Sequence, residues 1–133
     1  MSESGNIEVV KKLYTAFSAG DLAGVLDGLA PDIDWAYPKV RDVPFSGSVR
    51  GRQEVARFFE ALSASEEILI FQVHEFVGHG DRVVALGSWR SRVKATGRTY
   101  ETGFVHALTV RAGKLRRYEP FYDTAVQSEA FRP

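Results

Sequence analysis

The sequence predicts an α+β domain in which helices come first and an antiparallel sheet follows. Two observations lead to this prediction. In the first half of the chain, apolar residues recur at the three- and four-residue spacing of amphipathic helices. In the second half, residues 66–122 form four runs rich in β-branched and aromatic residues, separated by the glycine turns GHGD, ATGR and RAGK. Strands joined by short turns pair with their neighbours, so we expect a four-stranded antiparallel meander covered on one face by three helices.

The expected helices end where the sequence changes from periodic to turn-forming. Asn6 is predicted to cap the first helix and Gly20 to end it. Asp21 is predicted to cap a second helix, which Pro31 stops and whose inward residues are Leu22, Val25, Leu26 and Leu29. A third helix is expected over about residues 52–63, with an apolar face made of Val55, Phe58, Phe59 and Leu62.

A short strand is predicted between the second and third helices, in the stretch DIDWAYP (32–38). Alternate side chains of a strand point to opposite faces, so Trp35 and Tyr37 share a face with Ile33, while Asp34 points away. The following residues, 39–51, are rich in Pro, Gly and Ser and are expected to form a loop.

Length, charge and composition narrow the class of protein. The 133 residues suit one domain over 1–133, and the 17 basic and 17 acidic residues cancel. This balance gives no general attraction to nucleic acid or to an anionic membrane. No signal peptide is visible, so we expect a soluble, cytoplasmic protein without a nucleic-acid or membrane partner.

No metal or cofactor site is expected. The chain has no cysteine, and its three histidines show no His-x-x-x-His or Glu-x-x-His spacing. It also contains neither a phosphate-binding loop nor a dinucleotide fingerprint.

Strand parity places His106 among apolar residues. In the run YETGFVHALTV it shares a face with Phe104 and Leu108. Such an imidazole is either a hydrogen-bonded part of the core or the working group of a pocket, because imidazole exchanges protons near neutral pH. Glu101 lies five residues away and therefore on the opposite face, unless a bulge at Gly103 restores the parity.

The order of the elements and four stretches of sequence resemble the SnoaL-like branch of the NTF2-like superfamily, relatives of ketosteroid isomerases and polyketide cyclases. The stretches are AGDLAGVLDGLAPDIDW (19–35), GRQEVARFFEAL (51–62), ATGRTYETGFVHALTVRAGKL (95–115) and YEPFYDTA (118–125). The resemblance implies an NTF2-like cone: three N-terminal helices packed on a strongly curved, mainly antiparallel sheet that encloses an apolar pocket. It also implies a homodimer through the outer face of the sheet.

The resemblance further implies where chemistry would occur. In ketosteroid isomerase an aspartate is the base, and a tyrosine and a protonated aspartic acid bind the oxyanion. The base position falls on Tyr37, the protonated acid on His106, and the tyrosine on Leu13, next to Tyr14. None of these positions carries the residue of that enzyme, so steroid isomerase chemistry in its known form is not expected.

The candidate catalytic residues are His106 as acid or base, with Tyr37 and Tyr14 as donors to an enolate oxygen. Strand parity and helix faces direct further aromatic side chains to the same pocket. These predicted ligand contacts are Trp35, Phe58, Phe59, Trp89, Phe104, Tyr118 and Tyr122.

Three functions fit these patterns. The first is a cofactor-free cyclase or isomerase that uses acid–base chemistry on an apolar carbonyl compound. The second is a non-catalytic domain that binds a small apolar or aromatic ligand. The third is a dimerisation domain whose cone is filled with side chains. A cavity beside His106 would favour the first two functions over the third.

Overall fold

The computed structural model, which describes residues 2–133, has a six-stranded sheet with strand order β2-β1-β6-β5-β4-β3. The strands are β1 (Leu29–Trp35), β2 (Val49–Arg50), β3 (Glu66–His79), β4 (Arg82–Val93), β5 (Thr99–Arg111) and β6 (Lys114–Tyr122). The helices are α1 (Glu3–Ser18), α2 (Leu22–Asp27), α3 (Arg52–Ser65) and α4 (Thr124–Phe131). All neighbouring strands are antiparallel except β1 and β6, which are parallel.

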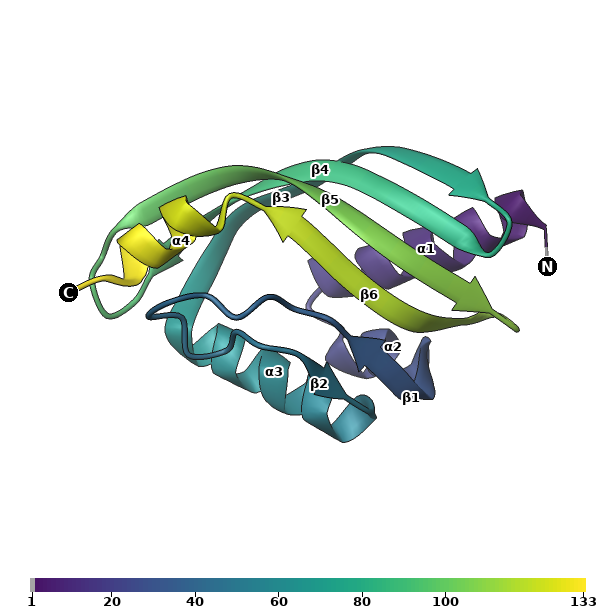
Figure 1. Ribbon diagram of the computed structural model, residues 1–133, viewed down its shortest axis with the longest axis horizontal. Coiled ribbons are helices and arrows are strands. Elements are labelled where there is room, and N and C mark those ends of the chain that lie inside the picture. The colour runs from purple at the N-terminus through teal and green to yellow at the C-terminus, as the bar shows by residue number, and fades with distance from the viewer. Residues whose placement is uncertain (1) are drawn as a thin grey trace.

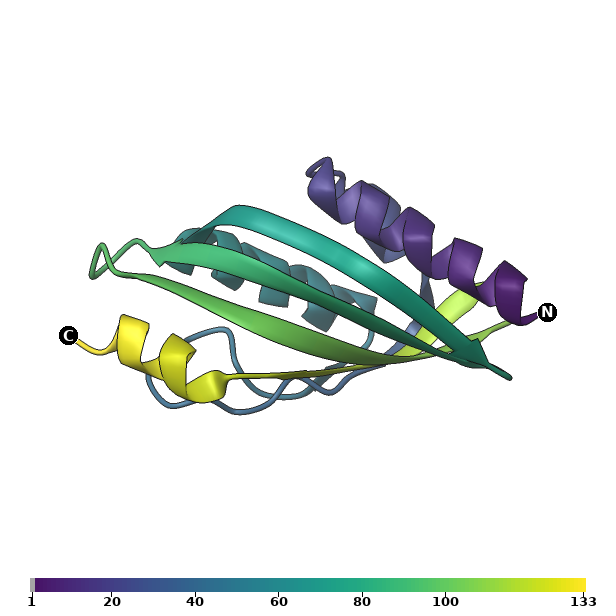
Figure 2. The ribbon, with the colours of Figure 1, turned by 90° about the horizontal axis from the view of Figure 1, so that it is seen from above.

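The sheet is strongly curved. Figure 1 shows β3, β4 and β5 as one arch with α1, α2 and α3 on its inner side. Figure 2 shows that α4 lies at the end of the sheet opposite the N-terminus. The predicted α+β class, the antiparallel meander and the third helix are therefore confirmed. The three predicted turn glycines, Gly80, Gly97 and Gly113, all have positive φ angles, which glycine adopts without steric cost.

The predicted cap of the first helix is wrong. The helix begins at Glu3, and the Ser2 hydroxyl oxygen accepts a hydrogen bond from the backbone N–H of Gly5 at 3.1 Å. Asn6 is instead a buried residue within the first helical turns, and its side-chain amide donates to the carbonyl oxygen of Gly80 at 3.2 Å. Its side chain therefore ties α1 to the turn between β3 and β4.

The predicted end of the second helix is also wrong. Helix α2 ends at Asp27, and strand β1 begins at Leu29. Between them, the carbonyl oxygen of Gly28 accepts a hydrogen bond from the N–H of Leu115 on β6, which starts the pairing of β1 with β6. Pro31 lies inside the strand, where the register between β1 and β6 is irregular. Leu22, predicted to point inward, is 36% exposed.

Two elements were not predicted from the sequence. Strand β2 lies in the expected loop and pairs with the end of β1. Helix α4 follows β6, and the Asp123 carboxylate caps it by accepting from the backbone N–H groups of Ala125 and Val126. Its buried Gln127 becomes part of the site described below.

Gly87 on β4 allows close packing across the centre of the sheet. A Cβ atom at this position would lie 2.1 Å from the carbonyl oxygen of Gln72 and 2.5 Å from the Phe104 ring. The absence of a side chain therefore lets the Phe104 ring lie directly over the β4 backbone.

We expect Gly87→Ala to lower the free energy of unfolding by about 1–3 kcal/mol, because the added methyl group forces the sheet and Phe104 apart. Urea unfolding measures the change. Gly103→Ala is the matched control, since a Cβ there meets its nearest atom, the Gly87 carbonyl oxygen, at 3.7 Å. Equal losses in the two variants would contradict the packing argument.

Candidate functional site

An apolar cavity of about 110 Å³ lies between the concave face of the sheet and the helices. All but one of the predicted site residues line it: His106, Tyr14, Tyr37, Trp35, Phe58, Phe59, Trp89, Tyr118 and Tyr122. The exception is Phe104, which is buried and stacks on the His106 ring with 4.0 Å between ring centroids. The cone is thus not completely filled with side chains.

The strands β5 and β6 bring His106 to the cavity wall. His106 lies between Ala85 of β4 and Pro120 of β6 in the sheet, and its side chain points inward with those of Phe104 and Leu108. The imidazole is 4% exposed, so its surroundings are almost entirely apolar.

Two tyrosine hydroxyl groups contact the two ring nitrogens of His106. The Tyr14 oxygen lies 2.6 Å from Nδ1, and the Tyr118 oxygen lies 3.4 Å from Nε2. A neutral imidazole donates from one nitrogen and accepts at the other, so both tautomers satisfy these contacts. The contact with Nε2 is long, which makes Nε2 the nitrogen more easily reached by a ligand.

Burial keeps these groups uncharged. Desolvation lowers the pKa of His106 to about 3, because the imidazolium ion loses its hydration in the apolar wall. Burial also raises the pKa of Tyr14 and Tyr118 well above the usual value of a phenol. At neutral pH these side chains therefore present a neutral imidazole and intact hydroxyl groups to the cavity.

A second polar group, which sequence analysis missed, extends from the cavity toward α4. We call it the Glu66 chain; its members are Glu66, Tyr100, Gln127, Tyr122 and Tyr37. Tyr100 donates to the Glu66 carboxylate, with oxygen distances of 2.7 and 2.9 Å, and accepts from the Gln127 amide at 3.1 Å. Tyr122 lies 2.5 Å from Gln127 Oε1 and 2.8 Å from the Tyr37 oxygen.

The Glu66 carboxyl group is the only carboxyl within residues 2–133 that is both buried and part of this inner face. Burial raises its pKa to about 7, although the hydrogen bond from Tyr100 opposes part of that effect. One signal in the sequence pointed toward this chain: Tyr100 has the same strand parity as His106. Gln127 lies in helix α4, which the spacing of apolar residues in the sequence did not predict.

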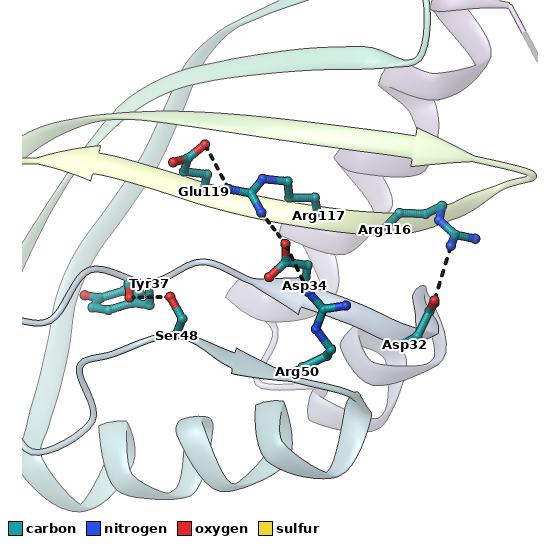
Figure 3. Close-up of polar contacts among 8 residues, drawn as sticks. All are labelled: Asp32, Asp34, Tyr37, Ser48, Arg50, Arg116, Arg117 and Glu119. Atoms are coloured by element: carbon teal, nitrogen blue, oxygen red, sulfur yellow. Dashed lines mark hydrogen bonds and ion pairs between the residues drawn. The ribbon is translucent and has the colours of Figure 1, made fainter.

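Two acidic residues that strand parity directed outward do lie outside the cavity. Asp34 forms ion pairs with Arg117 and Arg50 on the outer side of β1 (Figure 3). Glu101 is exposed and lies opposite Arg90 in a regular stretch of the β4–β5 ladder, so no bulge at Gly103 turns it inward. Neither carboxylate can act on a ligand in the cavity.

The other two histidines lie away from the cavity. His79 is exposed at the end of β3, and His74 is exposed beside Ser88 on the outer face. His74 does not share a face with Phe76 as a regular strand would place it, because β3 has a register shift between Val73 and Glu75. Within residues 2–133, no group of three or more His, Asp or Glu side chains is arranged to hold a metal ion.

This fold and cavity match a known family. Residues 10–118 match the family described as a SnoaL-like domain. The chain belongs to the SnoaL-like family. An NTF2-like protein from Burkholderia xenovorans is 35% identical to this SnoaL-like chain, and its crystal structure aligns over 99% of each chain with a TM-score of 0.89.

Two further comparisons cover nearly the whole SnoaL-like chain. TerC, in a crystal structure with polyporic acid, is 28% identical over 96% of this chain and 98% of its own, with a TM-score of 0.82. An uncharacterised protein of Mycobacterium tuberculosis is 24% identical over 133 residues, which are 98% of each chain. None of the described helices of the SnoaL-like domain is long and apolar enough to cross a membrane.

The two buried titratable groups make the stability of the domain depend on pH in opposite directions. Folded His106 has a pKa of about 3 against 6.5 when unfolded, so between these values the unfolded chain binds the extra proton. Folded Glu66 has a pKa of about 7 against 4.5 when unfolded, so here the folded chain binds the extra proton. His106 thus favours folding as the pH rises, and Glu66 favours it as the pH falls.

We therefore expect the two effects to cancel in the wild-type protein between about pH 4.5 and 6.5. Relative to wild type, His106→Gln should lose about 1.4 kcal/mol of unfolding free energy per unit of rising pH, and Glu66→Gln should gain as much. Urea unfolding at pH 4.5, 5.5 and 6.5 measures both differences. Differences from wild type that do not vary with pH would contradict the charge states assigned above.

Proposed function

We propose that the cavity binds a small apolar carbonyl compound and that His106 moves a proton next to its carbonyl group without a cofactor. The observation that carries this proposal is the position of His106, a titratable ring in an apolar wall between two tyrosine hydroxyls. The cavity of about 110 Å³ limits the ligand to a compact one, since it is smaller than an engineered cavity of about 150 Å³ in another protein that binds benzene. The crystal structure of TerC with polyporic acid supports a ligand site in this fold.

The proposed step transfers one proton. The C–H bond next to the carbonyl breaks, its electron pair becomes part of an enolate, and the proton goes to Nε2 of His106. Nδ1 then carries the other proton and donates it to the Tyr14 oxygen. Tyr118 and Tyr37, which both line the cavity, donate to the enolate oxygen.

The low pKa of His106 is compatible with this step because the enolate forms together with the imidazolium. The side chains of the cavity wall offer no charge to offset an imidazolium, and burial keeps the ring neutral. A bound enolate is an adjacent negative charge, and the pair as a whole is neutral. The ligand therefore supplies the counter-charge that the described residues around His106 do not.

A second candidate function is ligand binding without turnover. It is favoured by the short contact of 2.6 Å between Tyr14 and Nδ1, which holds the imidazole as a fixed part of the wall. In this function His106 and the tyrosines only orient a ligand oxygen.

Acetophenone serves as a probe of both functions, because it is a compact aromatic ketone with exchangeable methyl hydrogens. We expect the wild-type protein in D₂O to exchange these hydrogens for deuterium faster than buffer does, as measured by loss of the methyl proton signal in NMR spectra. His106→Ala should reduce the exchange by at least about 100-fold, the lower range for a general base. Trp fluorescence measures acetophenone binding in parallel.

The variant Glu101→Gln is the control, since Glu101 lies on the outer face of the same strand. Binding of acetophenone without exchange above buffer would favour the binding function and contradict the catalytic one. If acetophenone did not bind, the proposal of a carbonyl ligand would fail.

We also propose that the protein is a homodimer through the outer face of the sheet. Apolar side chains lie beside one another there across four strands: Val77, Val84, Leu86, Val105, Ala107 and Phe121. Phe121 is 54% exposed and pairs with Val105, which is also exposed. A second copy is the proposed partner because an apolar patch is complementary to itself across a two-fold axis.

Replacing Val105 and Phe121 together by lysine should convert the dimer to a monomer, since charges would face each other across the two-fold axis. Analytical ultracentrifugation measures the mass. Leu69→Lys is the control, because Leu69 is 42% exposed but lies on the edge strand β3 outside the patch. A monomeric wild-type protein would rule out the dimer.

A further inference from the structure

The Glu66 chain is a continuous series of hydrogen-bonding groups that has a carboxyl group at one end and the cavity at the other. Every link from Glu66 to Tyr37 has an oxygen–oxygen or oxygen–nitrogen distance between 2.5 and 3.1 Å. Tyr37 and Tyr122 line the cavity, whereas Glu66 lines an outer cleft between α2, α3 and β3. The chain therefore connects a titratable group outside the cavity to a hydroxyl in its wall.

Each hydroxyl group of the Glu66 chain has only one proton to donate. Which neighbour receives that proton therefore determines the donor and the acceptor in the next hydrogen bond. An ionised Glu66 can only accept, and Tyr100 then donates to it. The Tyr100 oxygen accepts from Trp89 Nε1 at 3.3 Å and from Gln127 Nε2 at 3.1 Å, which leaves Gln127 Oε1 facing Tyr122. Tyr122 has one proton and gives it to Gln127.

In that state, Tyr37 donates its own proton to Tyr122, 2.8 Å away, and its oxygen accepts a long contact of 3.4 Å from Gln127 Nε2. The second lone pair of the Tyr37 oxygen is an acceptor for the cavity. A protonated Glu66 gains a donor and thereby permits the reverse order. It donates to Tyr100, Tyr100 donates to Gln127 Oε1 after the amide turns over, and the amide nitrogen then faces Tyr122. Tyr122 now donates to Tyr37, and the Tyr37 proton is free to point into the cavity. Its one competitor in the chain is the Gln127 amide oxygen, which takes the place of the nitrogen now 3.4 Å from Tyr37.

We infer that Glu66 is a positioning residue that sets whether Tyr37 donates to or accepts from the ligand oxygen. Protonated Glu66 makes the site select a carbonyl group, and ionised Glu66 makes it select a hydroxyl group. This inference rests on the proposed carbonyl ligand and adds to it the group that controls the polarity of the site. Glu66 touches no ligand; it acts through Tyr100 and Gln127.

Burial raises the pKa of Glu66, and the neighbouring hydroxyls of Tyr100 and Ser91 lower it. Among residues 2–133, no charged side chain forms an ion pair with it. The charged side chains that share the outer cleft are exposed ones on α3, on β3, on β4 and directly after β4: Glu60, Glu67, Arg92 and Lys94. Arg92 pairs with Glu67 at 3.8 Å, and Lys94 donates to the Ser63 carbonyl oxygen at 2.6 Å. Helix α4 contributes the uncharged Gln127.

The test compares two probes of nearly equal shape, acetophenone and α-methylstyrene, in which a C=CH₂ group replaces the carbonyl. The measured quantity is the ratio of their dissociation constants, from Trp fluorescence, at pH 5.5 and pH 8.5. In the wild-type protein we expect the preference for acetophenone to be about threefold to tenfold larger at pH 5.5, the worth of one net hydrogen bond. Burial raises the pKa of Glu66 to about 7, which lies between the two pH values.

Glu66→Gln cannot ionise and should abolish the pH dependence of this ratio while keeping acetophenone binding. Tyr100→Phe breaks the chain one link further on and should do the same, which provides a second test if Glu66→Gln does not fold. Glu101→Gln and the double variant His74→Gln, His79→Gln change groups outside the cavity and should keep the wild-type pH dependence.

Failure of this inference differs from failure of the proposed function. If acetophenone binds and the wild-type ratio is the same at both pH values, the role of Glu66 is overturned while the carbonyl ligand stands. A pH dependence that persists in both Glu66→Gln and Tyr100→Phe overturns it as well. If acetophenone binds at neither pH, both proposals are overturned.

Discussion

Besides its tyrosines, the concave face of the sheet buries His106 and Glu66, without an ion-pair partner for either among residues 2–133. Burying a charged group without a partner is costly, so each group avoids charge by a shift in its pKa, downward for the imidazole and upward for the carboxyl. Both then depend on neutral tyrosine hydroxyls for their hydrogen bonds. Much of the aromatic wall can be understood from this requirement, since a tyrosine supplies apolar surface and a hydroxyl in one side chain.

The curvature of the sheet allows both polar groups to share one interior. The His106 site lies under α1, which contributes Tyr14, and the Glu66 chain lies under α4, which contributes Gln127. Between them, Trp89 and Phe104 separate the two groups with apolar surface, and Gly87 gives the Phe104 ring the room it occupies. The interior therefore has two polar regions with different protonation behaviour rather than one mixed cluster. That separation keeps the carboxylate from stabilising an imidazolium in the empty cavity.

Strand parity explains why the wall of the cavity could be predicted from the sequence. In the regular ladder between β4 and β5, alternation placed His106 and Trp89 inward and Glu101 outward. Along β1 and the residues that follow it, alternation separated Tyr37 from Asp34. Parity failed at His74, where β3 bulges, because a one-residue shift inverts every later side chain. The predicted helix boundaries were wrong where contacts with distant residues determine the structure. Asn6 donates to a distant turn instead of capping its helix. Pro31 lies in a strand instead of ending a helix, because that strand pairs with β6. Gln127 could not be found at all, since its role depends on where α4 docks.

His106 and Glu66 differ in pKa and in access to the cavity, and both differences bear on how a cofactor-free site could work at neutral pH. A general base is most effective when its pKa is near the operating pH, and by that measure the carboxyl group is the better matched of the two. Geometry, however, places Glu66 behind Tyr100 and Gln127, so it reaches the cavity only through hydrogen bonds. His106 lines the cavity directly, and in the proposed step it becomes basic only when a ligand brings negative charge. The roles proposed for the two groups are therefore separate: His106 responds to charge that develops on the ligand, whereas Glu66 sets the hydrogen-bond direction of the wall before the ligand arrives.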